Sequence, residues 1–482
     1  MKKFTQLSGL TMLLILIGSC TITTKIVEKQ GVFDRITPII DYNHLVVRFP
    51  EEWDAAKIDA FLASAEFKKN SNNETIIERC KCGDTRLVRL TWDFTDRTLA
   101  DIQGAKNGLT GGTGQSQGDW PFTFSLPLIK EENQFKLTDF SKLTRFDFNL
   151  TPTHKVSGKK GLSISNKQAK IEALKQSLIA SGANDSKVNI AVIDTGMDFY
   201  KNKDLDPFLY STEGLDFGCT GQESGWDFVT NSPDVTDDNG HGTYVTRLIT
   251  SQLDSKEVKY RILPIKAFNA NGEGNYWDIV CALSYVLKVQ QENNDLDIVN
   301  ASFGYTFFNS QISDKDLKVY KDSSIVKSLI EELALNNTLV VGSAGNINHN
   351  IEERMKENFP ASFTSENILG VGGHVKTDLG SMDTDGNYGN ISLDLAAPYG
   401  DYEYTFLDLH NLKKEFVELQ GSSYSAAFTT AKIAEIIKSK QYARVPPSEL
   451  KEILFKQDVP NPWTKIHEVL KPKISGGFYL EK

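Results

Sequence analysis

Short apolar segments that alternate with helical patterns most constrain the fold of this chain. They lie at 188–193, 262–267, 296–300 and 339–342, and apolar residues at helical spacing separate the later ones. Strands that alternate with helices favour a parallel sheet with helices on both faces. We therefore predict an α/β fold with a central, mostly parallel sheet flanked by helices and preceded by a small α/β domain.

Four parts are expected along the 482 residues. They are a signal segment 1–19, a small α/β unit 34–98, a linker 99–149 with its glycines concentrated at 104–118, and a large domain 150–475. The small unit shows apolar alternation typical of strands around one helical pattern, and the glycine-rich stretch is typical of a flexible linker. A long amphipathic helix is also predicted over 167–181.

The first twenty residues have the features of an export signal. Lys2 and Lys3 precede an apolar run at 10–17, which is too short to span a bilayer, and small residues follow it. Cys20 comes directly after the small residues, which resembles a bacterial lipoprotein box in which the thiol is lipidated. We expect a lipid-anchored protein of the bacterial cell envelope, outside the cytoplasm. An ordinary signal peptide that contains a cysteine is the alternative.

Composition excludes some partners and cofactors. Lys and Arg number 53 against 63 Asp and Glu, and this net charge of −10 argues against a nucleic-acid partner. Cys80 and Cys82 form one C-x-C motif, too sparse for a zinc site. We expect them, with the isolated Cys219 and Cys281, to be free thiols, although an exported protein can oxidise some. No metal or cofactor is assigned, and a monomer is expected.

Three separated motifs offer the groups of a nucleophilic triad. Asp194 follows an apolar strand, His241 lies between two glycines, and Ser423 opens a helical pattern. Alone, each has a structural interpretation, such as a helix cap for the Asp or the Ser. Together they supply a hydroxyl, a base that takes its proton and a carboxylate that orients the base. The order Asp, His, Ser also differs from that of the α/β-hydrolases.

A fourth motif supplies a donor for the negative charge that develops on an attacked carbonyl. Asn346 ends the strand-and-turn sequence 341–346 and presents a side-chain amide. Its amide and the backbone N–H of Ser423 could together stabilise an oxyanion, a contribution worth about 10²–10³ in kcat per donor.

These motifs, in this order, resemble the subtilisin-like serine proteases over about residues 185–440. The resemblance implies a cleft whose two edges pair with an extended polypeptide, which is therefore the expected partner. The implied substrate-binding residues are Gly272, Glu273 and Gly274 on one edge, Ser302, Phe303 and Gly304 on the other, and Ala344 and Gly345 beside them. Asn358 lies near the expected floor of the main pocket, where it indicates a shallower or more polar pocket.

Departures from the family pattern concern helix packing and calcium. Tyr244 stands where the family usually has a second His, and Ser422, Tyr424, Ser425 and Ala427 replace Thr, Met, Ala and Pro. These changes leave the triad and Asn346 in place. The segment 246–259 is too short for the family's common calcium loop, although three aspartates could bind a cation weakly: Asp234, Asp237 and Asp238.

The leading hypothesis is a secreted, lipid-anchored serine endopeptidase. Two alternatives remain: a catalytically inactive relative that still binds peptides, and an esterase or acyltransferase that uses the same triad. The unit 34–98 lies where such proteases carry a pro-domain, and an accessory or substrate-docking domain is the other interpretation. A pro-domain would be cut off within the glycine-rich stretch 104–118.

Overall fold

The computed structural model describes most of the chain from His44 onward. The described residues are 44–63, 76–91, 117–119, 123–125, 151–152, 186–197, 208–215, 219, 221–306, 314–376, 382–400, 402–408, 413–441, 443–456 and 461–482. The signal segment with Cys20, the helix expected over 167–181 and most of the linker 99–149 lie outside these residues.

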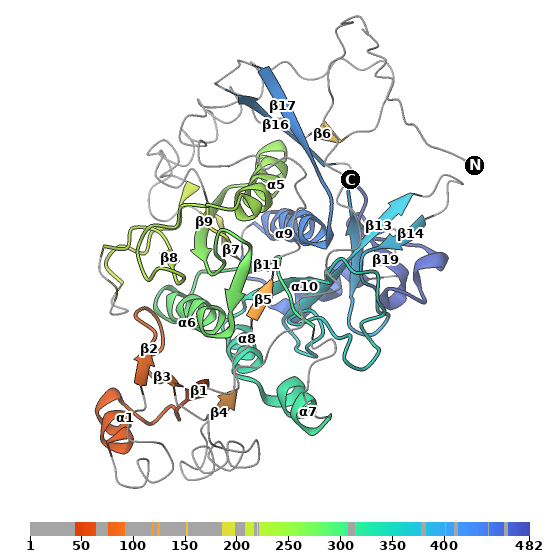
Figure 1. Cartoon of the computed structure of the whole chain (residues 1–482). Helices are drawn as coiled ribbons and strands as arrows, with labels where there is room; N and C mark the ends of the chain where they lie inside the picture. Colours follow the sequence, from red (N-terminus) through yellow and green to blue (C-terminus); the bar gives the residue numbers. More distant parts are fainter. Residues whose placement is uncertain are drawn as a thin grey trace, which may run out of the picture.

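A ten-stranded sheet forms the centre of the molecule (Figure 1). Its spatial order is β18 (Lys465–Ile466), β19 (Phe478–Tyr479), β15 (Leu395–Pro398), β13 (Ile368–Lys376), β12 (Leu339–Ser343), β11 (Ile298–Ala301), β7 (Val188–Asp194), β9 (Tyr260–Lys266) and β8 (Trp226–Asp227), with β14 (Met382–Asp385) paired to β13. From β19 to β8 every neighbouring pair is parallel, whereas β18 and β14 join antiparallel. The predicted fold class is confirmed.

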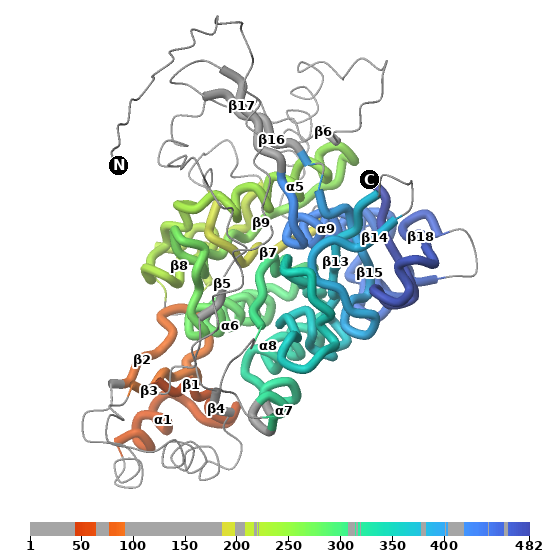
Figure 2. Tube along the Cα trace, turned by 45° about the vertical axis from the view of Figure 1, so that its right-hand side comes forward, coloured from red at the N-terminus to blue at the C-terminus, as the bar shows by residue number. Residues whose placement is uncertain are grey.

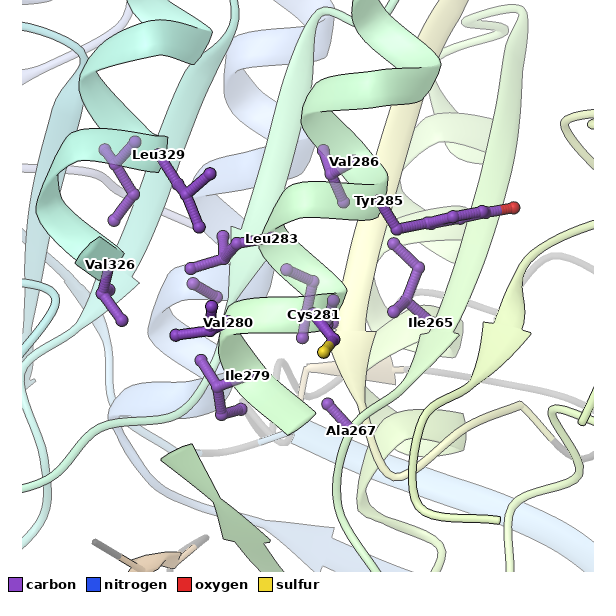
Figure 3. Close-up of a cluster of buried hydrophobic side chains, with 14 of the residues drawn as sticks. Ile265, Ala267, Ile279, Val280, Cys281, Leu283, Tyr285, Val286, Val326 and Leu329 are labelled. Atoms are coloured by element: carbon purple, nitrogen blue, oxygen red, sulfur yellow. The ribbon is translucent and has the colours of Figure 1, made fainter. Parts of the chain in front are cut away.

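Helices cover both faces of this sheet because side chains alternate along its strands. In β7, Val188, Ile190 and Val192 point into one apolar core, and Ala191 and Ile193 point into another. The first core also takes side chains from α5 (His241–Ser255), α9 (Ser422–Ser439) and α10 (Pro447–Phe455). The second takes them from α6 (Tyr276–Asn293), α7 (Asp314–Ser323) and α8 (Ile325–Leu335), and part of it is drawn in Figure 3.

Smaller elements complete the large domain. A three-stranded sheet contains β17 (Lys413–Leu419), β16 (Tyr402–Asp408) and β6 (Thr151–Pro152), and two short 3₁₀ turns, η4 (Glu468–Leu470) and η5 (Ser475–Gly477), lie near the C-terminus. No helix among the described residues is both long enough and apolar enough to cross a membrane.

An antiparallel sheet and one helix form the N-terminal unit, which lies below α6 and α8 in Figure 2. Its elements are β1 (His44–Arg48), α1 (Ala55–Leu62), β2 (Ile76–Arg79), β3 (Leu87–Thr91) and β4 (Gln117–Asp119), in the sheet order β2-β3-β1-β4. Along β1, Leu45 and Val47 face the core under α1, whereas Val46 joins the core of α6. The sheet is therefore shared between a core of its own and that of the large domain.

Two disulfides join this unit to the large domain, and they correct the expectation of free thiols. Cys80 is bonded to Cys281 on α6, and Cys82 to Cys219. The Cα–Cα distances of 5.6 and 5.2 Å lie in the usual range for such bonds. The partners are 201 and 137 residues apart in sequence, so only the packing of the unit against α6 brings them together.

Candidate active site

A carboxylate and an imidazole meet at the carboxyl edge of the sheet. Asp194 is the last residue of β7, and His241 is the first of α5. The His241 Nδ1 atom lies 2.8 and 3.0 Å from the two Asp194 carboxylate oxygens. Both side chains are buried, and the Thr195 N–H also donates to the carboxylate. The Asp therefore receives the partners that a buried carboxylate needs, and it holds the imidazole through Nδ1.

Gly242 allows α5 to begin this close to β7. A Cβ at this position would collide with the Gly196 carbonyl oxygen and lie 3.1 Å from the Asp194 Cβ. Its backbone N–H donates to the Thr195 hydroxyl over 2.8 Å. The His-Gly pair is thus needed for backbone approach as well as for chemistry.

Asp237 organises the start of α5, a role that the sequence analysis missed. Its carboxylate accepts from the backbone N–H groups of Asn239, Gly240 and Thr243 and from the Thr243 hydroxyl. An Asp a few residues before a helical pattern is an ordinary capping signal, which could have identified it. The carboxylate is therefore occupied by protein donors rather than open to a cation.

The other two aspartates proposed as weak cation ligands also bond to the protein. Asp238 accepts from the ammonium of Lys266 over 2.6 Å, and Asp234 accepts from Thr236. Lys266 is itself buried and donates to the Thr195 and Phe268 carbonyls, which ties β9 to the Asp194 turn. Within the described ranges, no group of three or more His, Cys, Asp or Glu residues is placed to hold a metal ion.

Ser423 lies at the second position of α9, which packs alongside α5. The ring of the next residue, Tyr424, lies 5.8 Å from that of His241. The Ser423 hydroxyl donates to the Ser302 carbonyl over 2.9 Å, and the Ser302 hydroxyl donates back to the Ser423 carbonyl over 2.8 Å. Ser302, expected on the cleft edge, thus contacts the serine directly.

Asn346 is held beside the start of α9 with its amide nitrogen available. Its side-chain oxygen accepts from the Ser422 N–H over 2.8 Å, and the Ser422 hydroxyl accepts from the Gly345 N–H over 2.9 Å. The Nδ2 group of Asn346 is buried and has no hydrogen-bond acceptor among the described residues. These two bonds hold the motif 344–346 against the serine motif at the start of α9.

One expected cleft edge carries a strand of the chain itself. β10 (Glu273–Asn275) pairs antiparallel with β5 (Thr123–Ser125), which places Gly274 opposite Phe124. Gly272 begins this edge. On the other edge Phe303 is buried, and its ring lies 5.2 Å from that of Phe268 beneath Gly274. The two predicted edges are therefore connected through the core.

Asn358 fills the space between two predicted substrate-binding glycines. Its amide donates to the Ser343 carbonyl over 2.9 Å. A Cβ added at Gly304 would collide with this amide, and one at Gly345 would lie 3.3 Å from its oxygen. The Asn358 side chain is buried beside these two glycines, and the shallower or more polar pocket expected here stays a prediction.

A parallel α/β sheet whose carboxyl edge carries a buried Asp–His pair, with a serine at the start of a neighbouring helix, defines a protein of the subtilisin-like fold class. Residues 185–463, more than half of the chain, match the model of the subtilase family. The chain therefore belongs to the subtilase family.

The curated relatives that match this chain are proteases, and their sequence identity to it is low. The chain is 26% identical over 284 residues to subtilisin-like protease 1 of Plasmodium vivax, which covers 53% of this chain and 41% of the relative. It is 24% identical over 295 residues to the thermostable alkaline protease of Halalkalibacterium halodurans, 58% and 62% of the two chains. A subtilisin-like protease of Coccidioides posadasii matches over 26% of its length. The chain thus spans about a quarter of that relative and about two fifths of the Plasmodium vivax one.

Solved structures share the fold. Fervidolysin from Fervidobacterium pennivorans, described as a keratinolytic enzyme related to subtilisin, superposes with a TM-score of 0.54 at 16% identity, covering 93% of this chain and 61% of that one. The epidermin leader peptide processing serine protease of Staphylococcus aureus gives a TM-score of 0.52 at 13% identity, covering 91% and 96%. At these identities the likeness concerns the fold alone.

Proposed function

We propose that this subtilase is a serine endopeptidase that cleaves polypeptides with Ser423 as the nucleophile. His241 takes the hydroxyl proton during attack on the peptide carbonyl and gives it to the leaving amine, which leaves an acyl-enzyme on Ser423. Water then hydrolyses this ester: His241 takes a proton from the water and returns it to the Ser423 oxygen, so that protons balance over the cycle. Asp194 holds the imidazole and stabilises it when it is charged. The Asn346 amide and the Ser423 N–H donate to the tetrahedral oxyanion.

The buried Asp194–His241 pair beside the start of α9 is the observation that carries this proposal. In this structure the Ser423 hydroxyl donates to the Ser302 carbonyl, so in the reaction it has to exchange this acceptor for His241. A change of side-chain rotamer is small compared with a backbone rearrangement.

The polypeptide substrate is inferred from the cleft edge. β10 pairs through its backbone with the extended segment β5, and a substrate strand would use the same backbone groups. Pairing of this kind recognises the peptide backbone, and it therefore favours a polypeptide substrate over a small ester.

Hydrolysis of unfolded casein by the purified chain tests the proposal, with Ser423→Ala as the variant. We expect turnover in the wild type and its loss in the variant. Ser425→Ala is the matched control, because this neighbouring hydroxyl donates to the Pro398 carbonyl on the sheet rather than to the cleft. Equal hydrolysis by wild type and Ser423→Ala would contradict the proposal.

Covalent labelling separates the remaining alternatives. A fluorophosphonate should label the wild type at Ser423 and leave Ser423→Ala unlabelled. Absence of labelling in the folded wild type would favour an inactive peptide-binding protein. Turnover of short esters without turnover of peptides would favour an esterase.

We also propose that Cys20 carries lipid and anchors the protein outside the cytoplasm. The two disulfides support an oxidising compartment, because such bonds are rare in reducing cytosol. A clickable fatty-acid probe fed to an expressing bacterium should label the wild type. The Cys20→Ala variant should lose the label and the association with membranes; a label that survives this change would disprove the site.

A further inference from the structure

The N-terminal unit is attached to the large domain at two covalent points. Cys80 and Cys82 follow β2, and their partners Cys281 and Cys219 belong to the large domain. Cys281 lies in the N-terminal half of α6, among the buried side chains of Figure 3. Either disulfide alone would keep the unit attached if the chain were cut between Cys82 and Cys219.

A close apolar contact surrounds these bonds. Val46 and Leu87, on the sheet face opposite α1, are fully buried in the core that includes α6. Gly83 lies against that helix so tightly that an added Cβ would be 2.5 Å from the Ser284 hydroxyl and 3.1 Å from the Tyr285 nitrogen. The unit therefore packs directly against α6 and is not attached to it through the disulfides alone.

A buried guanidinium also spans the contact. Arg48 at the end of β1 is 6% exposed, and it bonds to Asp84 in its own unit and to Glu332 on α8, the latter over 2.9 Å from Nη2. Removing the unit would therefore separate a buried cation from one of its carboxylates, which is costly.

The chain passes from this unit to the edge of the expected substrate cleft. β4 pairs with β1 in the N-terminal sheet, and β5, a few residues later, pairs with β10 on the cleft edge. The strand that follows the N-terminal unit along the chain thus occupies backbone positions that a substrate would use. Tethering keeps such a segment at an effective concentration of about millimolar even after a cut.

We propose that the N-terminal unit is a permanent part of this protein, so that a cut of the chain between β5 and β7 yields two chains joined by both disulfides. The unit then leaves only when both bonds are reduced. Each reduction takes two electrons and two protons from an external dithiol, which becomes a disulfide itself. This inference goes beyond the proposed peptidase activity and does not depend on it.

A defined cut tests retention without any self-cleavage. The full chain with Ser423→Ala receives a recognition sequence for a site-specific protease between residues 126 and 150, is exported to an oxidising compartment and is then cut. We expect one species of full mass on a denaturing gel without reductant and two fragments with dithiothreitol. Two fragments without reductant would overturn the proposal.

Paired substitutions act as controls. Cys80→Ser with Cys281→Ser, or Cys82→Ser with Cys219→Ser, should each leave the cut chains joined, whereas the fourfold variant should separate. If that variant does not fold, peptide mapping of the wild type decides the point. Trypsin cuts after Lys81, so Cys80 and Cys82 fall in different peptides, each of which should be recovered with its own partner.

A native measurement tests whether the bonds, rather than the packing, keep the unit in place. The cut protein is diluted and passed through gel filtration, oxidised or after dithiothreitol. We expect a single peak when it is oxidised and a separated N-terminal fragment when it is reduced. A reduced sample that stays in one peak after dilution would show that the disulfides are not needed for retention.

Discussion

Asn346 illustrates how a single backbone donor fixes the orientation of a side-chain amide. The Ser422 N–H can only donate, so the oxygen of the Asn346 amide must face it. The amide nitrogen is buried and has no acceptor among the residues that the structure describes, and a buried donor in this state is costly unless a ligand uses it. The arrangement has the form of an anion-binding donor that is built before the substrate arrives.

Asn346→Ala should lower kcat by about 10²–10³ and change KM little, because the donor acts on the oxyanion and not on the bound substrate. Steady-state kinetics on a peptide substrate provide the measurement. Asn350→Ala is a control from the same loop, since its side chain accepts from the Glu352 N–H within that loop. An equal fall in kcat for both variants would indicate a loop defect instead.

The sequence predicted the residues of this site better than their contacts. Asp194, His241 and Asn346 carry recognisable types and neighbours, and the pairing of the first two is seen directly. The reciprocal bonds between Ser302 and Ser423 depend on how β11 and α9 meet, and no local pattern encodes that meeting.

At the scale of single elements, buried carboxylates at strand ends couple stability to pH. Asp297 at the start of β11 accepts from the Asn189 N–H over 2.9 Å. Burial raises its pKa to about 7 from 3.8, against the lowering effects of that bond and of Arg444. The folded protein therefore binds a proton that the unfolded chain releases between these two values.

Stability from this group is complete below about pH 4 and is lost as pH rises through about 7. Asp297→Asn keeps an acceptor for Asn189 and cannot ionise, so its urea midpoint should fall less between pH 5 and pH 8 than that of the wild type. One pKa unit corresponds to about 1.4 kcal/mol. Between pH 5 and pH 8 the wild type should therefore lose a few kcal/mol more free energy of unfolding than Asp297→Asn. Asp322→Asn, at an exposed position of α7, should follow the wild type, and parallel curves for all three proteins would refute this prediction.

The strands of the central sheet could be predicted from the sequence because a short, continuous apolar run is typical of a buried strand. The strands at 188–194, 260–266, 298–301 and 339–343 all lie within a few residues of the predicted runs. β5 was not anticipated, since a three-residue strand inside an expected linker owes its form to its partner β10.

At the scale of the whole molecule, Arg48 forms an ionic link between the two units. Its guanidinium is buried between Asp84 and Glu332, whereas Arg79 in the same unit pairs with the exposed Asp59. Loss of a buried partner is far more damaging than loss of an exposed one.

Arg48→Ala should lower the free energy of unfolding by about 2–4 kcal/mol, less than a fully buried pair would lose because Glu332 is partly exposed. Arg79→Ala should cost at most about 1 kcal/mol. Chemical unfolding of both variants with the disulfides intact provides the comparison. Equal losses would indicate that the contact between units does not depend on this cation.

The two disulfides could not be predicted from the sequence. Cys80 and Cys281 are separated by 201 residues, and their meeting follows from the seating of a small sheet on α6. A thiol count cannot specify such long-range pairing, which is why free thiols were expected.

The nesting of the two bonds also governs how the chain responds to force. Cys82 and Cys219 both lie inside the loop that Cys80 and Cys281 close. When the ends are pulled apart, the 201-residue loop stays locked, which withholds roughly 700 Å of contour length at about 3.4 Å per residue. More than two fifths of the polymer is thereby shielded from tension, and a reducing agent would appear in a stretching trace as a sudden gain in length.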